Sequence, residues 1–310
     1  MIDFSVNLLS LRVIISCIGL VGNLFLILVI LQAKLSRVKS FELFLLGIAT
    51  ANLEEILIVN IYDIIILQPS SIIIDAWLCR SLKFLTMFGE IGSILFTVLI
   101  SIFRQQKLRD ASKRVNLPIY LDSIRSAWMV SGVCVMLATL LSLPVFAVNS
   151  QSPAGNSTGN SSSSCPPDFF QCGGNDCPLL NLIYKYLFIL VCNLLPLVIV
   201  TVTSCLIISV LLSQRKTVTP VVSVSGGSQS GGKSKRLRIQ RSTIAVLAAM
   251  ALFQVDWTLY LVFQLTVSPA DFPYWAETEF FISTSYTSIS PYVYGIGNNL
   301  FSLKNFMKKS

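Results

Sequence analysis

The sequence predicts an all-α membrane protein, a bundle of seven membrane-spanning helices with a short amphipathic helix at its C-terminal end. Three observations predict this class: the composition, the spacing of the apolar stretches and the distribution of basic residues. Of the 310 residues, 54% are hydrophobic and 12% are charged, and the mean hydropathy is +0.73. About 25% of the residues of a typical soluble domain are charged. A protein with several membrane spans therefore explains this composition better than a soluble protein does.

Seven apolar stretches mark the expected spans, which we assign to one domain covering residues 1–310. They lie at about residues 11–32, 41–67, 77–103, 124–148, 182–212, 242–267 and 275–297. Each is long enough for a helix to cross a hydrocarbon core of about 30 Å. The tail mixes apolar and basic side chains, as a short helix lying on the membrane does; they are Leu300, Phe301, Leu303, Lys304, Phe306, Met307, Lys308 and Lys309.

The basic residues orient the spans. Most of the 23 lysines and arginines follow spans one, three and five or lie in the tail; the exceptions are Arg12, Arg80, Lys83 and Lys185. The positive-inside rule then predicts an extracellular N-terminus and a cytoplasmic C-terminus in the plasma membrane. The net charge of +8 thus reflects orientation and does not indicate nucleic-acid binding. The chain has no histidine, which excludes histidine-based metal sites and catalytic triads.

The third span carries its polar side chains on one helical face. They recur at steps of three and four residues, and they are Cys79, Lys83, Thr86, Glu90, Ser93, Thr97, Ser101 and Arg104. A face with charged residues should turn toward other helices or a water-filled cavity rather than toward lipid. We therefore expect a central helix in the bundle; the alternative is a peripheral span with a few tolerated polar residues.

The second span is unusually acidic. Asn52, Glu55 and Asp63 share one stripe, whereas Glu54 lies on a different face. One charge at the middle of a membrane costs about 2.5–3.5 kcal/mol on insertion scales, so several carboxyl groups in one span indicate a role. That role is either a hydrogen-bond network that positions helices or a surface that faces a ligand or ion.

The segment 149–180 is rich in Ser, Gly, Asn and Pro and reads as a loop. Its two N-x-S/T sequons, at Asn156 and Asn160, predict glycosylation on the outer side of the membrane. Three of its residues are cysteines, which together with Cys79 are the thiols expected to meet an oxidising compartment; the three are Cys165, Cys172 and Cys177. Four cysteines allow three full pairings, and the spacing does not choose among them.

A second polar segment, residues 213–241, separates spans five and six. Its Gly/Ser-rich stretch, residues 223–232, predicts a flexible linker flanked by basic residues.

Short motifs spread over nearly the whole chain resemble those of rhodopsin-like G-protein-coupled receptors. They are Gly22-Asn23, Cys79 and Arg104 at the two ends of span three, Trp128, Pro196, Phe253-x-x-x-Trp257 and Pro291-x-x-Tyr294. Each motif alone is weak, whereas the set is specific.

The chain departs from that family's pattern in informative ways. Asn52 stands where an aspartate is usual, Phe103-Arg104-Gln105 replaces the acidic-Arg-Tyr triplet, Ser290 replaces an asparagine, and no proline follows Trp257. Together with Ala51-Asn52-Leu53 and Ser290-Pro291-Tyr292-Val293-Tyr294-Gly295, these features look like a vomeronasal type 1 receptor or a class-A-related olfactory receptor. Bitter-taste receptors and other rhodopsin-like receptors are the nearest alternatives.

This resemblance implies a chemosensory receptor that binds a small odorant or pheromone and activates a heterotrimeric G protein, with no cofactor and no enzymatic activity. The ligand would contact the outer half of the bundle, with Lys83, Glu90, Glu55, Asp63 and Glu279 as candidates. The candidate switch residues are Arg104, Tyr294 and Trp257. The family's disulfide would join Cys79 to Cys172. A small-solute carrier or channel, whose polar stripe would line a conduction path, is the competing class; nothing in the residues supports an intramembrane enzyme.

The resemblance also raises two questions about this chain. Because Asn52 stands in place of the family's aspartate and Ser290 in place of its asparagine, a sodium site of the family's type is in doubt. Because Phe103 replaces the acidic neighbour of Arg104, any restraint on Arg104 must come from elsewhere, and we expect a backbone carbonyl or a hydroxyl on span six. The simpler alternative for Arg104 is an anchor at the lipid headgroups.

Overall fold

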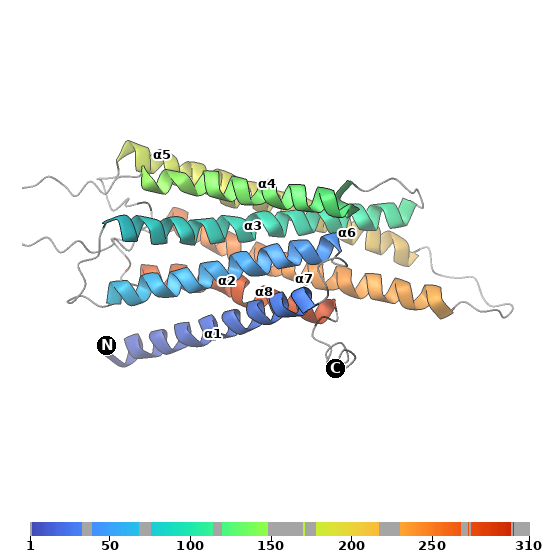
Figure 1. Cartoon of the computed structure of the whole chain (residues 1–310), viewed down its shortest axis with the longest axis horizontal. Coiled ribbons are helices and arrows are strands. Elements are labelled where there is room, and N and C mark those ends of the chain that lie inside the picture. The colour runs from blue at the N-terminus through green and yellow to red at the C-terminus, as the bar shows by residue number, and fades with distance from the viewer. Residues whose placement is uncertain are drawn as a thin grey trace, which may run out of the picture.

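Helices lying side by side along one axis make up the described part of the chain, as the computed structural model shows (Figure 1). The structure describes residues 2–32, 39–67, 76–113, 120–147, 170, 178–216, 230–267, 272, 274–298 and 300. Its elements are α1 (Ile2–Gln32), α2 (Ser40–Leu67), α3 (Ala76–Lys113), η2 (Tyr120–Asp122), α4 (Ile124–Ser142), η3 (Leu143–Phe146), α5 (Leu179–Phe188), η4 (Ile189–Leu194), α6 (Leu195–Lys216), α7 (Ser230–Thr266) and α8 (Trp275–Gly297). No strand occurs among these residues, so the predicted all-α class is confirmed.

Six stretches of helix are long and apolar enough to cross a membrane, judged by length and composition among the described residues. One of them, Leu179–Ser213, includes α5, η4 and most of α6. The π-helical turn η4 comes directly before Pro196, whose ring removes a backbone donor and disturbs the α-helical ladder. Span five is thus one rod with a π-bulge near its middle.

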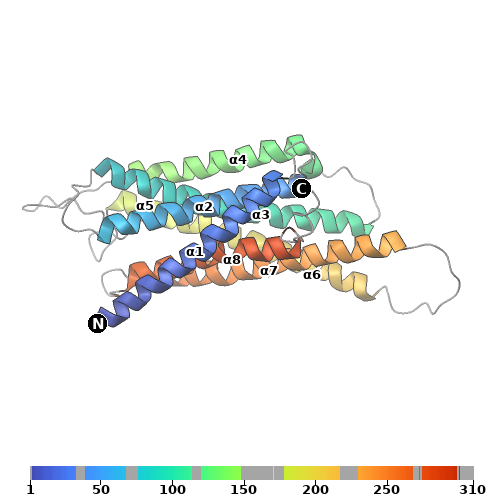
Figure 2. The same cartoon turned by 60° about the horizontal axis from the view of Figure 1, so that its bottom comes forward.

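The helix α8 is not among these six because hydroxyl side chains dilute its apolar character. It nevertheless packs against α1 and α7 (Figure 2). Its hydroxyl-bearing residues Thr284, Thr287 and Ser290 are buried inside the bundle rather than exposed. A seventh helix therefore completes the bundle, although its sequence is too polar for a simple hydropathy criterion.

The helix α3 lies at the centre of the bundle, between α2, α4 and α6, with contacts to α7. In its most apolar window 72% of the residues are buried, against 44% or fewer in the other spans. The whole predicted stripe from Cys79 to Ser101 is buried. The central position expected from the polar period is confirmed, and the peripheral alternative is wrong.

The prediction of a flexible linker at residues 223–232 is partly wrong. The helix α7 begins at Ser230, inside the Gly/Ser-rich stretch, and includes the basic segment up to Arg241. Lysine, arginine, leucine and glutamine are strong helix formers, so a polar segment next to a span can continue its helix. For the same reason α3 extends to Lys113, beyond the expected end at residue 103. The expected tail helix, except Leu300, lies outside the described residues.

Candidate functional site

A continuous set of buried polar groups follows the stripe of α3 through the bundle, and we call it the polar column. We call the end of the column near Cys79 the outer end and the end at Arg104 the inner end. The column has an outer acidic level (Glu54, Glu55 and Glu90), a middle amide level (Asn23, Asn52, Ser93 and Ser290) and an inner arginine level (Arg104, Ser242 and Asn298).

The middle amide level joins four helices through Asn52. Its amide nitrogen donates to Asn23 Oδ1 on α1 at 3.3 Å and to Ser290 Oγ on α8 at 3.2 Å. The hydroxyl of Ser93 on α3 donates to Asn52 Oδ1 at 2.6 Å. Asn23 in turn donates to the Thr287 carbonyl on α8 at 2.9 Å. The hydrogen bonds among these four side chains join amide and hydroxyl groups and involve no carboxylate. Asn52 therefore belongs to a network that positions helices.

Gly22, next to Asn23, lets α1 approach α8 closely. A Cβ atom at this position would lie 2.6 Å from the Tyr292 ring and 3.0 Å from Pro291 Cγ. The Gly22-Asn23 pair therefore combines a small residue, which permits the contact, with an amide that hydrogen-bonds across it.

The outer acidic level brings together three carboxyl groups from α2 and α3. Glu55 is 2% exposed and Glu90 is 8% exposed. Each of them has a buried oxygen without a hydrogen-bond partner in the described part of the chain, and both oxygens of Glu54 are in the same situation. Glu55 interacts electrostatically with both of the other carboxyl groups. Buried carboxyl groups with unused acceptor capacity can receive hydrogen bonds from a further molecule.

Gly89 explains why Glu54 joins this level although its helical face differs from that of Glu55. A Cβ atom at Gly89 would collide with Glu54 Oε2, and it would lie 3.0 Å from Glu55 Cβ and from the Glu55 backbone nitrogen. The missing side chain lets α2 lie so close to α3 that two neighbouring acidic residues both face it. Helical period alone did not indicate this arrangement.

Glu90 has an electrostatic influence on groups of three further elements. It interacts electrostatically with Tyr184 on α5, Cys192 on η4 and Tyr260 on α7. Tyr260 also donates to Glu279 Oε1 on α8 at 3.5 Å. Of the two predicted ligand contacts Glu90 and Glu279, Tyr260 thus hydrogen-bonds to Glu279 and interacts electrostatically with Glu90.

The other predicted ligand contacts lie on α3, α8 and α2. Lys83 is buried, 3% exposed, two helical turns outward of Glu90 on the same stripe. Glu279 accepts a hydrogen bond of 2.6 Å from Gln264 Nε2 on α7. Asp63 lies on α2, but its side chain is outside the described set.

An aromatic group of α7 lies between the outer and inner ends. The Trp257 ring contacts Phe253 and Tyr260, with ring centroids 5.8 Å and 5.1 Å apart. Phe253 also packs edge-on against Tyr286 of α8 at 5.4 Å. The Tyr286 hydroxyl is 2.8 Å from Thr97 Oγ1 on the α3 stripe and 3.5 Å from the Tyr294 hydroxyl. These contacts connect Trp257 to Tyr294.

Arg104 occupies the inner end of the column and contacts three other helices or helix ends. Its Nη2 donates to Ser242 Oγ on α7 at 2.6 Å and to Asn298 Oδ1, just after α8, at 3.2 Å. Its guanidinium carbon lies 3.6 Å from the centre of the Phe41 ring on α2. The hydroxyl expected on span six is thus that of Ser242.

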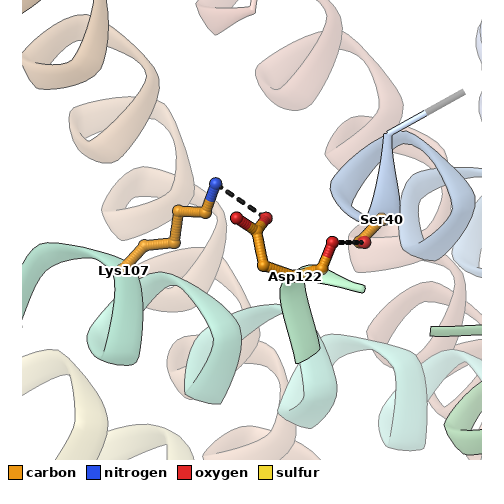
Figure 3. Close-up of polar contacts among 3 residues, drawn as sticks. All are labelled: Ser40, Lys107 and Asp122. Carbon is orange, nitrogen blue, oxygen red and sulfur yellow. Dashed lines mark hydrogen bonds and ion pairs between the residues drawn. The ribbon is translucent and has the colours of Figure 1, made fainter. Parts of the chain in front are cut away.

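A second contact at the inner end fastens η2 to two helices (Figure 3). Lys107 Nζ on α3 pairs with Asp122 Oδ1 at 2.8 Å, and Ser40 Oγ at the start of α2 donates to the Asp122 carbonyl at 2.9 Å. The Asp122 carboxylate is therefore engaged by Lys107, one turn of helix away from Arg104.

Several predicted features concern covalent or metal chemistry. Cys79 is disulfide-bonded, and its partner is outside the described residues, as are Cys172, Asn156 and Asn160. The described cysteines within the spans, Cys17, Cys134, Cys192 and Cys205, are free. Over the residues that could be searched, no group of three His, Cys, Asp or Glu side chains could hold a metal ion.

Sequence reasoning missed Asn298 and Tyr286, which complete the inner level and its connection to Trp257. Asn298 follows the expected end of span seven and belongs to no motif that we quoted. Tyr286 lies eight residues before Tyr294, a spacing that places both on one helical face, and this was the available signal.

Comparison with known protein families identifies this arrangement. A family model described as 7 transmembrane receptor (rhodopsin family) matches residues 22–293, which include all the elements from the middle of α1 to near the end of α8. No curated protein matches the chain.

Proposed function

The chain belongs to the rhodopsin family of seven-transmembrane receptors, and from this membership we propose that it is a chemosensory receptor for a small odorant or pheromone. As a member of this family it is a multi-pass membrane receptor, not an enzyme, that signals through a G protein. The proposal adds the vomeronasal type 1 or related olfactory subtype. It also places the receptor in the plasma membrane with its N-terminus outside.

The observation that carries the proposal is the continuity of the polar column. Among the described residues, its outer end offers buried carboxyl oxygens without hydrogen-bond partners, and its inner end has an arginine that donates hydrogen bonds to neutral groups. Hydrogen bonds and ring contacts run from Tyr294 through Tyr286 and Trp257 to Tyr260, which interacts electrostatically with Glu90 of the outer level. A ligand that changes the outer groups therefore has a connected, packed path by which to affect the inner end.

In the proposed ligand site, Glu55 and Glu90 accept hydrogen bonds from the ligand. Glu279 accepts a hydrogen bond from Tyr260, and Lys83 and Asp63 lie further outward on α3 and α2. This arrangement favours a small molecule with at least one hydrogen-bond donor, because unpaired buried acceptors are otherwise unsatisfied.

The site is tested by glutamine substitutions and a ligand screen with a G-protein readout. For an agonist found in the screen, Glu90→Gln and Glu55→Gln should raise the half-maximal concentration about two- to tenfold, because one ordinary hydrogen bond is worth about 0.5–1.5 kcal/mol. Glu42→Gln is the matched control, since Glu42 accepts a bond from Lys39 N at the opposite end of α2. Equal half-maximal concentrations in all three variants would mean that the ligand binds elsewhere.

In the proposed switch, Trp257 senses the ligand through Tyr260, and Tyr294 and Arg104 respond at the inner end. Arg104→Lys keeps the charge but loses the planar fork, whereas Arg104→Ala loses both. We expect both variants, once shown to reach the cell surface, to have altered basal and ligand-stimulated nucleotide exchange. If both signal like the parent receptor, Arg104 is only an anchor.

The competing class is a small-solute carrier or channel. Within the described residues, the polar groups of α3 are packed and bonded across helices at Ser93–Asn52 and Thr97–Tyr286, which favours the receptor. Substrate flux into vesicles, without G-protein activation by the same ligand, would support the carrier instead.

A further inference from the structure

We propose that Asn298 is a positioning residue that, together with Ser242, holds Arg104 in the resting receptor through a latch without an acidic partner. The inference rests on the proposed function, because it assumes that release of Arg104 promotes G-protein activation. It goes beyond that function by naming the group that restrains Arg104 and the helix end to which it is fixed.

The orientation of the Asn298 amide follows from its own contacts. Its Nδ2 donates to the Tyr294 carbonyl at 2.8 Å. A carbonyl oxygen can only accept, so this bond assigns the nitrogen to that side and leaves Oδ1 facing Arg104. The backbone N–H of Asn298 also bonds to the Tyr294 carbonyl at 3.2 Å. Asn298 is therefore fixed to the last turn of α8 and presents one acceptor to the centre of the bundle.

Ser242 closes a triangle of hydrogen bonds. Its Oγ accepts from Arg104 Nη2 at 2.6 Å and donates to Asn298 Oδ1 at 2.5 Å. Asn298 Oδ1 in addition accepts directly from Arg104 Nη2 at 3.2 Å. Each bond polarises the next, and the triangle connects α3, α7 and α8 at one point. If α7 moved away from α3 and α8, the two hydrogen bonds made by Ser242 would break.

The latch uses neutral acceptors, although Lys107, one helical turn after Arg104, has an acidic partner. The Asp122 carboxylate pairs with Lys107. The second face of Arg104 is covered by the Phe41 ring at 3.6 Å, a cation–π contact rather than an ion pair. The neutral triangle therefore explains how an arginine without its usual acidic neighbour is still held in place.

Two substitutions of Asn298 test the latch because they should act in opposite directions. Asn298→Ala removes the acceptor of two sides of the triangle and should raise basal nucleotide exchange by at least about two- to tenfold, the range for one ordinary hydrogen bond. Asn298→Asp offers Arg104 a charged acceptor and should lower basal exchange several-fold, because charge-assisted bonds are stronger. The side chain is partly exposed, so a carboxylate can turn away from the Tyr294 carbonyl.

The control variants separate this effect from general damage. Asn60→Ala removes an amide that bonds to Ser16 near the outer end of α2, and it should leave basal exchange unchanged. In an Arg104→Ala background, Asn298→Asp should no longer lower basal exchange, which gives a double-mutant cycle for the pair.

A second measurement does not depend on a G protein. Hydrogen–deuterium exchange of the purified full-length receptor should show faster exchange at residues 242–250 and 290–298 in Asn298→Ala and slower exchange in Asn298→Asp. If these rates change as expected while no variant activates any G protein, the latch is right and the proposed signalling function is wrong. If the parent receptor activates a G protein but both Asn298 variants behave alike, the latch is wrong and the proposed function stands.

Discussion

Replacing Asn52 by alanine should destabilise the receptor more than the same change at another asparagine of α2. Asn52→Ala removes three bonds, to Asn23, Ser290 and Ser93, which lie on three different helices. Interhelical hydrogen bonds in membrane proteins average about 0.6 kcal/mol each, so three amount to about 2 kcal/mol. The buried partners that lose a bond and the cavity that remains increase this figure.

Asn60→Ala is the matched control on the same helix. Asn60 also donates from its amide, but both of its interhelical bonds go to Ser16 on α1: Asn60 Nδ2 donates to Ser16 Oγ at 3.0 Å, and Ser16 Oγ donates to Asn60 Oδ1 at 3.1 Å. Its third bond stays within α2 at the Ile56 carbonyl. Two interhelical bonds to a single helix predict a loss of about 1.2 kcal/mol. The two variants thus delete the same group from the same helix and differ in the number of helices that they disconnect.

The buried free thiols of Cys134 and Cys192 provide the assay. A thiol-reactive dye should label them only when the purified receptor unfolds, and the temperature of this transition gives Tm. At about 2–4 °C per kcal/mol, Asn52→Ala should lower Tm by about 4–8 °C and Asn60→Ala by about 2–5 °C. Equal shifts, or an unchanged Tm in Asn52→Ala, would refute the assignment of the middle amide level as a structural network.

Three further predictions concern the surfaces at the two ends. Deglycosylation should increase the gel mobility of the parent receptor but not that of the double variant Asn156→Gln, Asn160→Gln; a shift that persists rules out these sites. Non-reducing peptide mapping should link Cys79 to Cys172, and Cys79→Ser should lower the free energy of unfolding by about 2–5 kcal/mol; recovery of Cys79 in a peptide with another partner contradicts the pairing. Asp122→Asn breaks an ion pair whose two side chains are 43% and 51% exposed, so the change in the free energy of unfolding should stay below about 1 kcal/mol and vanish at high salt. A larger loss at high salt would mean that η2 contributes more than this pair.

The membrane-spanning helices and the polar face of α3 could be predicted because both depend on local sequence. Membrane insertion responds to the apolar content of about 20 successive residues, so composition alone indicated a helical membrane protein. The polar face of α3 depends only on the helical period, and the buried residues Lys83, Glu90, Ser93 and Thr97 lie where that period placed them.

Helix ends in polar segments were harder to predict. The start of α7 at Ser230 and the end of α3 at Lys113 lie in charged sequence, where apolar content gives no signal and helix propensity decides. The burial of α8 was hard to predict for a related reason, because hydropathy describes only the average preference of a side chain. Thr284 and Ser290 are polar, yet they are buried because neighbouring helices enclose them.

The sequence by itself therefore determined which residues lie in helices that cross the membrane and which face of α3 is polar. Only the tertiary structure decided which polar groups meet. A helical period gives the face of one helix, but the rotation of each helix and its distance to the next result from packing, for example from the missing side chain of Gly89. That packing turned Glu54 toward α3, gave Asn52 partners on three helices, and placed Ser242 and Asn298 on Arg104, contacts between residues up to 238 positions apart in the chain.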